Sequence, residues 1–163
     1  MLPKFHFKGK SLFAATSYFT FTLYIFYSIF LLFFSPYRQS AHSRFEDSGA
    51  AYNLVPFWTI RNYIKASDHI NFNAWFSNLA GNVLVFMPLG FFLPLLFPKY
   101  FSFWRTLLLV ITSTILVELL QFQLKVGSLD VDDIILNTIG GIIGFIVFKI
   151  AYLLFRLFYK RSS

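Results

Sequence analysis

Hydrophobic residues run along this chain in four long stretches, and polar residues gather between them and at their ends. The stretches cover residues 12–34, 78–97, 103–124 and 134–158. Each is long enough for a helix that crosses the hydrocarbon core of a bilayer, which takes about 20 residues. The pattern predicts an all-α integral membrane protein: a single membrane domain over residues 1–163 with four transmembrane helices.

Composition supports the same fold class. Hydrophobic residues make up 57% of the chain and aromatic residues 22%, whereas charged residues make up only 13%. A soluble domain of this size could not bury so much apolar surface, but lipid can solvate it. The chain has no cysteine, which excludes disulfides, thiolate metal sites and cysteine nucleophiles.

The basic residues predict the topology. The net charge is +7, but the basic residues do not form one stripe, so we expect no nucleic-acid partner. Instead, they flank the apolar stretches and lie in three segments that four helices would place on one side: Lys4, Lys8 and Lys10; Lys99 and Arg105; Arg156, Lys160 and Arg161. The positive-inside rule then predicts a multi-pass protein of the cell membrane with both termini in the cytoplasm.

Residues 35–76 form the only long loop that the pattern predicts, and it would be extracellular. Within it, residues 53–64 mix aromatic and basic side chains, as a short helix in the membrane interface does. An ordinary aromatic belt explains the aromatics. It explains less well the grouping of Asn53, Pro56 and Arg61 in the same few residues.

Polar side chains also occur inside three of the predicted helices. Asn78 and Asn82 share a face of the second helix, near its start. Glu118 and Gln121 share a face near the end of the third helix. A carboxyl group within a membrane helix is rare and costs roughly 2.5–3.5 kcal/mol on insertion scales, so a functional role for Glu118 competes with a role as a structural link between helices.

The fourth helix begins with the richest polar group. Asp130 and Asp133 precede Asn137, and glycines continue the same spacing down the helix. At about 100° per residue, Asp133, Asn137, Gly140 and Gly144 fall on one face. Gly140 and Gly144 would form a groove that lets another helix backbone approach closely, and Gly141 is a further structural glycine. Pro88 and Gly90 in the second helix are expected to weaken or kink it.

In the predicted topology all these polar groups lie at the extracellular ends of their helices, which favours a site that opens outward. The candidate binding residues are Asn53, Arg61, Asn78, Asn82, Glu118, Gln121, Asp130, Asp133 and Asn137. Glu118, Asp130 and Asp133 could hold Mg²⁺ or Ca²⁺. Glu118 and Asp133 could instead divide into a general acid and a general base. No motif of known mechanism matches, and the catalytic residues stay unassigned.

Each aspartate also has a structural interpretation. Asp130 could cap the fourth helix, and Asp133 could complement the positive end of its dipole. We expect Asp132 to face solvent.

Four motifs together resemble the VanZ-like family of small membrane proteins: NLVPF (53–57), GNVLVFMPLG (81–90), VELLQF (117–122) and DVDDIILNTIGGIIG (130–144). The resemblance covers about residues 53–148. The family's pattern maps onto Asn53, Pro56, Asn82, Pro88, Gly90, Glu118, Gln121, Asp130, Asp133, Asn137, Gly141 and Gly144. It implies a role in resistance to teicoplanin-type lipoglycopeptide antibiotics, and it implies no known reaction.

Three classes of function follow from these observations. The first is a non-catalytic envelope protein whose outward polar pocket engages a lipoglycopeptide or a lipid-linked wall precursor. The second is a membrane enzyme acting on a lipid-linked or phosphate-bearing substrate, with Glu118 and Asp133 as acid and base or as ligands of a divalent cation; the sequence identifies no cofactor. The third, a transporter, is disfavoured because the inner halves of the helices offer no polar path. The spacing of Gly140 and Gly144 could mediate a homodimer or pack the fourth helix on the second within one chain, which we favour.

Overall fold

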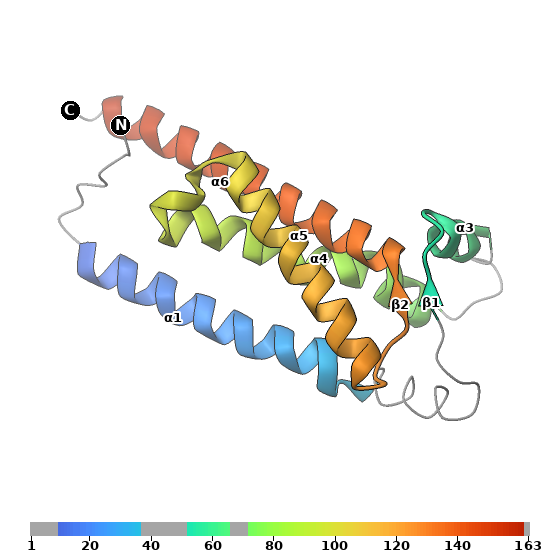
Figure 1. Ribbon diagram of the computed structural model, residues 1–163. Coiled ribbons are helices and arrows are strands. Elements are labelled where there is room, and N and C mark those ends of the chain that lie inside the picture. Colours follow the sequence, from blue (N-terminus) through green and yellow to red (C-terminus); the bar gives the residue numbers. More distant parts are fainter. Residues whose placement is uncertain (1–9, 37–51, 66–71, 162–163) are drawn as a thin grey trace.

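The computed structural model describes residues 10–36, 52–65 and 72–161. Four long helices dominate it: α1 (Lys10–Ile29), α4 (Phe72–Leu96), α5 (Phe103–Gln123) and α6 (Val131–Arg161) (Figure 1). All four provide a segment long and apolar enough to cross a membrane. The predicted fold class of four transmembrane helices is confirmed. The side of the membrane on which the termini lie stays a prediction.

Shorter elements join the long helices. A π-helix, η1 (Phe30–Phe34), continues α1, and a 3-10 helix, η2 (Pro98–Phe101), connects α4 to α5. The α1–α4 connection holds a two-residue strand, β1 (Tyr52–Asn53), and a short helix, α3 (Trp58–Lys65). Strand β2 (Leu129–Asp130) precedes α6 and pairs in parallel with β1, so that two distant connections are joined at one end of the bundle.

The surface of the bundle is apolar. Large hydrophobic side chains stand exposed on all four long helices, among them Phe26 at 68%, Trp104 at 74% and Leu157 at 57%. A soluble monomer rarely exposes contiguous apolar surface of this kind, whereas in a bilayer lipid tails solvate it. The exposed hydrophobic residues therefore mark the lipid-facing surface of the membrane domain.

Helix α4 differs from the prediction at its start. It begins at Phe72, inside the segment for which the sequence predicts a loop, because no glycine or proline interrupts the residues from Phe72 to Ala80. It then stays helical through Pro88 and Pro94. Neither proline has an N–H group, so each leaves one carbonyl of the preceding turn without its helical donor.

Glycines bring α4 and α6 into backbone contact, and these two helices pack together more extensively than any other pair. A Cβ atom added to Gly140 would collide with the carbonyl of Val83, and one added to Gly144 would collide with the carbonyl of Met87. Gly90 on α4 lies in the same way against the backbone of Gly141. The glycine groove is thus occupied by a helix of the same chain. A homodimer stays a prediction, and it would need another surface.

Helix α5 covers the α4–α6 pair with one buried face. Val110 is 1% exposed and packs against Gly141, where it would meet any Cβ atom. Thr114, Glu118 and Gln121 continue this face and are at most 1% exposed. The polar residues of α5 therefore point into the bundle and away from lipid.

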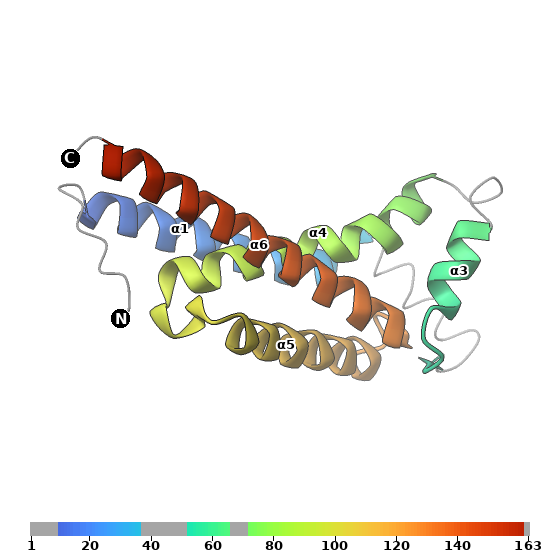
Figure 2. The same ribbon diagram turned by 90° about the horizontal axis from the view of Figure 1, so that it is seen from above.

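Helix α1 lies on the other side of α4 and begins at the end of the bundle where α6 ends (Figures 1 and 2). The Tyr24 hydroxyl donates to the carbonyl of Val85, at 2.8 Å, and the Tyr18 hydroxyl donates to the carbonyl of Leu96, at 3.3 Å. Both bonds satisfy carbonyls of α4 in the absence of water. Strands β1 and β2 and helix α3 lie at the opposite end of the bundle.

Candidate functional site

Buried polar side chains gather where β1, β2, α3 and the start of α6 meet. The cluster contains four carboxylates, each 9% exposed or less, and the amides that contact them. Its members come from both strands and from four helices: Asn53 from β1, Thr59 from α3, Asn82 from α4, Glu118 from α5, Asp130 from β2, and Asp132, Asp133 and Asn137 from α6. We call these eight residues the polar cluster.

Asp130 caps helix α6, as one interpretation of the sequence predicts. Its Oδ1 accepts the backbone N–H of Asp132 at 2.8 Å, which satisfies one of the free donors at the helix start. The same oxygen accepts from Asn53 Nδ2 at 3.0 Å, and Oδ2 accepts from the Thr59 hydroxyl at 2.6 Å. One carboxylate therefore ties the start of α6 to β1 and to α3.

Asp132 does not face solvent, so that expectation is wrong. Its side chain is 0% exposed. The carboxylate accepts hydrogen bonds from three backbone N–H groups at the start of α3. Oδ1 accepts from Phe57, and Oδ2 accepts from Thr59 at 2.8 Å and from Ile60 at 3.1 Å. The first turn of a helix leaves such groups without intrahelical partners, and its dipole favours a negative charge there. Asp132 thus caps a helix that begins more than 70 residues earlier in the chain.

The segment before α3 forms a tight turn from Val55 to Trp58, closed by a 3.3 Å bond from the Trp58 N–H to the Val55 carbonyl. Pro56 takes the second position. Phe57 takes the third with φ of 64°, a left-handed conformation that costs a non-glycine residue roughly 1–2 kcal/mol. Asn53 supports the turn by accepting the Val55 N–H on Oδ1, at 3.0 Å. The bond to Asp132 and the proline offset the strain at Phe57.

Helices α4 and α6 meet through an amide and a carboxylate. Asn82 Nδ2 donates to Asp133 Oδ1 at 2.6 Å and to the carbonyl of Asn78 at 3.0 Å. Asn82 thereby obtains the partner that an amide at this depth requires. The Asn78 side chain is only half-buried and lies one turn earlier on the same helix.

Glu118 is 1% exposed and accepts the backbone N–H of Asp130 on Oε2, at 3.1 Å. Its carboxylate therefore contacts the connection between α5 and α6 directly. This bond agrees with the structural interpretation of Glu118, and a functional role for this residue stays a prediction.

Gln121 serves another part of the fold. Its Nε2 donates to the carbonyl of Leu32 at 2.8 Å, within η1. A π-helix shifts the backbone hydrogen-bond pattern of an α-helix, and Gln121 satisfies a carbonyl in this irregular turn. The amide thus links α5 to the end of α1.

Asn137 contributes an acceptor without a partner. It is 1% exposed, and its Oδ1 is a buried polar atom for which the described residues provide no hydrogen bond. A buried acceptor left unpaired costs about 1–3 kcal/mol. The atom lies one helical turn below Asp133, so the cluster contains one position that a donor from outside could fill.

Arg61 is exposed on α3, and its guanidinium is not among the groups that form the polar cluster. Within the described ranges, no group of three His, Cys, Asp or Glu residues is arranged to hold a metal ion. Many of the carboxylate oxygens already accept hydrogen bonds from the protein. A divalent cation at Glu118, Asp130 and Asp133 stays a prediction.

Two residues of the cluster are absent from the predicted set. Thr59 joins Asp130 and Asn53, and Asp132 caps α3. Asp132 stands two residues after the cap of α6, a position at which a carboxylate usually faces solvent. It is buried here because α3, which is distant in the sequence, packs against the start of α6. Thr59 stands directly after Trp58 in the predicted interfacial segment, where a hydroxyl carries no specific signal.

Comparison with known proteins bears on the same residues. The model of the VanZ/LLP1 family matches residues 18–155, which is most of the chain. The chain belongs to the VanZ/LLP1 family. The matched region contains all four long helices in whole or in part and every residue of the polar cluster, so the cluster is part of the shared domain.

One relative within VanZ/LLP1 is Protein VanZ of Enterococcus faecium, which is 30% identical over 92 residues. The alignment covers 56% of this chain and 48% of that protein, so the chain spans about half the length of its curated relative. No solved structure matches the chain. Family membership and the four apolar helices establish a multi-pass membrane protein.

Proposed function

We propose that this VanZ/LLP1 protein contributes to resistance to teicoplanin-type lipoglycopeptide antibiotics, and that it acts in the cell envelope by engaging the drug or a lipid-linked wall precursor. The family supports a link to teicoplanin resistance. The observation that carries the proposal is the convergence of the polar cluster at one end of the bundle, directly beneath an apolar segment.

That apolar segment consists of the exposed side chains of β1, the turn and the start of α3. They are Tyr52 at 69%, Leu54 at 64%, Val55 at 61%, Phe57 at 55% and Trp58 at 57% exposed. The bonds to Asp130 and Asp132 hold this segment in place. A lipid-tailed ligand combines a polar head with a hydrocarbon chain, and the cluster and the segment offer it both kinds of surface side by side.

Among the described residues the proposed polar pocket is closed. Its carboxylates are buried, and they accept hydrogen bonds from α3 and α4. Displacing the β1–α3 segment would expose Asp130, Asp132 and the donors they hold. The unpaired Oδ1 of Asn137 then supplies an acceptor for a ligand N–H or O–H group. We propose that the protein binds this ligand without converting it, because the cluster can hold a ligand through hydrogen bonds without acid–base catalysis.

The test uses cells whose teicoplanin resistance depends on this protein. Glu118→Gln and Asp133→Asn remove charge and keep size, and Ser128→Ala at an exposed loop position serves as the control. With membrane levels matched, we expect both charge variants to lose resistance to teicoplanin and the control to keep it. Vancomycin, which lacks the lipid tail, serves as the reference drug. Unchanged teicoplanin susceptibility in both charge variants would contradict the proposal.

A second candidate function is an enzyme acting on a lipid-linked or phosphate-bearing substrate. It is favoured by two buried carboxylates, Glu118 and Asp133, and by the unpaired Oδ1 of Asn137, one helical turn from Asp133. Purified protein in detergent would be incubated with extracted wall lipids, with and without Mg²⁺. A product that forms with the native protein and not with Glu118→Gln would favour the enzyme, and no product under any divalent ion would favour binding.

A further inference from the structure

A cavity of about 390 Å³ lies between α1, α4 and α6, in the half of the bundle away from the polar cluster. Its volume is within the range of pockets that hold small ligands, about 300–1,000 Å³. Aromatic and small residues line it: Phe13, Thr16, Ser17 and Thr20 of α1; Phe91, Phe92 and Leu95 of α4; Phe148, Ala151, Tyr152 and Phe155 of α6.

The lining has a regular spacing on both outer helices. The α1 residues stand at positions i, i+3, i+4 and i+7 from Phe13, and the α6 residues have the same spacing from Phe148. This spacing places each set on one face of its helix, so two continuous faces enclose the cavity along about two turns. A channel of this shape runs along the helices and suits an elongated ligand.

The cavity has a buried floor and an open rim. Phe148 is 2% exposed and Ser17 is 8% exposed, whereas Phe13 at the rim is 56% exposed. Phe148 packs edge-on against Phe91, with ring centroids 6.0 Å apart, and stacks with Tyr152 at 6.1 Å. These ring contacts form a preorganised wall, which lowers the entropic cost of binding an apolar ligand.

The hydroxyl of Thr16 does not make the cavity a polar site. Its Oγ1 donates to the carbonyls of Leu12 and Phe13, at 2.9 and 3.0 Å, within its own helix. A threonine bonded in this way has no donor left for a ligand. Most of the lining side chains are apolar, and the Thr16 hydroxyl is engaged within its own helix, so the cavity favours a hydrocarbon over a hydrogen-bonding molecule.

All the lining residues belong to candidate membrane spans: Leu12–Phe34, Asn78–Leu96 and Val131–Phe158. The medium around an open apolar cavity in these spans is lipid hydrocarbon, and an unfilled cavity would forfeit the dispersion contacts of its walls. We propose that the cavity is a binding site for one acyl chain of an anionic phospholipid.

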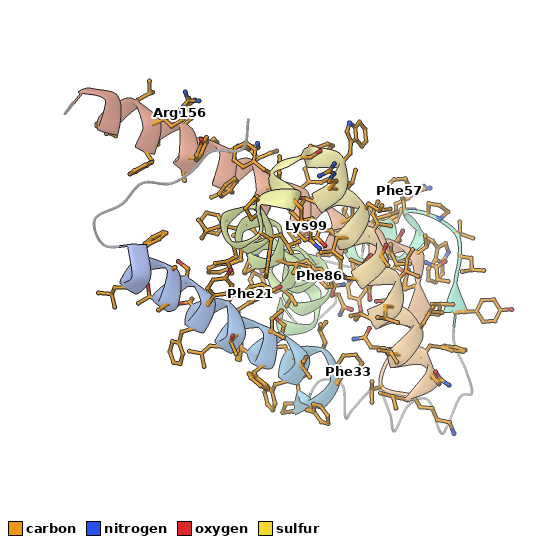
Figure 3. All side chains as sticks on the ribbon, turned by 60° about the vertical axis from the view of Figure 1, so that its left-hand side comes forward. Phe21, Phe33, Phe57, Phe86, Lys99 and Arg156 are labelled. Carbon is orange, nitrogen blue, oxygen red and sulfur yellow. The ribbon has the colours of Figure 1, made fainter. Side chains whose placement is uncertain are left out.

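The anionic headgroup follows from Arg156. It stands four residues after Tyr152, so it lies one turn further along the same side of α6 as the lining face. Arg156 is exposed and lies near the free end of α6, whereas Phe57 lies on the opposite side of the molecule (Figure 3). Since an arginine near a helix end extends toward the headgroup region, it would lie beside the headgroup of a lipid whose chain fills the cavity, where a net negative charge is favoured over a zwitterionic headgroup.

This site is independent of the proposed function, because none of its residues belongs to the polar cluster. The test compares lipid retention by purified protein in detergent, counted by native mass spectrometry after addition of phosphatidylglycerol or phosphatidylcholine. Ala151→Phe fills the cavity. Ala15→Phe places the same ring on an exposed alanine of α1 that does not line it, and serves as the matched control.

We expect the native protein and Ala15→Phe to retain phosphatidylglycerol about tenfold more tightly than Ala151→Phe does, a difference of about 1.4 kcal/mol. Arg156→Gln should retain both lipids equally, having lost the preference for phosphatidylglycerol. Equal retention by Ala151→Phe and the native protein would overturn the site. A native protein that retains phosphatidylcholine as well as phosphatidylglycerol would overturn its anionic selectivity.

A second measurement does not depend on variants. Phosphatidylglycerol with a photoreactive diazirine in mid-chain is added to the native protein, the excess is removed by detergent exchange, and the adducts are mapped after irradiation. We expect them to concentrate on the lining segments, residues 13–20, 91–95 and 148–155. Adducts spread evenly over exposed positions outside the cavity, such as Trp104 and Leu108, would contradict the proposal.

Discussion

The Asp132 carboxylate lies 2.8 Å from the backbone nitrogen of Thr59, which precedes it by 73 positions. One carboxylate thereby caps a helix that belongs to a different connection of the bundle. The strained turn at Phe57 and the exposed apolar segment are held in place by this contact.

Removing the Asp132 carboxylate should release α3 from the bundle. Asp132→Ala leaves three backbone N–H groups without an acceptor, and each such buried group costs about 1–3 kcal/mol. We expect amide hydrogen exchange of Phe57, Thr59 and Ile60 to accelerate at least tenfold in detergent. Asn62→Ala, at an exposed position of α3, is the control, and unchanged exchange in Asp132→Ala would show that the cap does not hold the helix.

The glycines of α6 should not tolerate even one methyl group. Gly144→Ala would drive a Cβ atom into the carbonyl of Met87, and overpacking of this kind costs about 1–3 kcal/mol. Gly81→Ala is a matched control, because its nearest contact would be an ordinary 3.8 Å to a carbonyl of Phe76. Alanine also favours a helix by up to about 1 kcal/mol, so Gly81→Ala should be neutral or stabilising.

Thermal unfolding in detergent, followed by the loss of the monodisperse species, measures both glycine variants. A Gly144→Ala protein as stable as Gly81→Ala would mean that α4 and α6 can separate without loss.

The bond between Gln121 and the Leu32 carbonyl should stabilise the junction of α1 with α5. Gln121→Leu keeps a similar volume and leaves that carbonyl without its donor in an apolar setting. We expect a loss of about 1–2 kcal/mol in the free energy of unfolding. Gln123→Leu is the reference substitution, because Gln123 is exposed at the end of the same helix, and equal stability of the two variants would argue against the bond.

The predicted topology can be tested directly because the chain contains no cysteine. Ser128→Cys introduces a thiol in the exposed connection between α5 and α6, and Ser102→Cys introduces one between α4 and α5. In intact cells a membrane-impermeant maleimide should label position 128 and not position 102. The opposite labelling would place the polar cluster on the cytoplasmic side and remove the support for an outward-facing site.

The helices could be predicted from the sequence because hydropathy reports directly which segments lipid can solvate. The capping role of Asp130 could also be predicted, since its partner lies two residues away. Local patterns of this kind need no knowledge of the tertiary arrangement.

The contacts of Asp132 and Gln121 could not be predicted in the same way. Asp132 finds donors in α3, and Gln121 finds an acceptor in an irregular turn 89 residues earlier. Both partners are backbone groups, which every residue carries, so side-chain identity does not reveal them. The early start of α4 at Phe72 could not be predicted from hydropathy either, because hydropathy marks the segment that lipid can solvate and does not mark where the helix itself begins.

The glycine contacts between α4 and α6 also bear on the order of biosynthesis. Helix α4 is synthesised well before Gly140 and Gly144, against which it packs in the finished protein. Asn82 is likewise synthesised before its partner Asp133. Until the start of α6 has been translated, Asn82 lacks its bond to Asp133, and Glu118 lacks its bond from the Asp130 N–H. A chain interrupted before residue 130 would thus present a clear signal for membrane quality control, and we expect such fragments to be degraded rather than to accumulate.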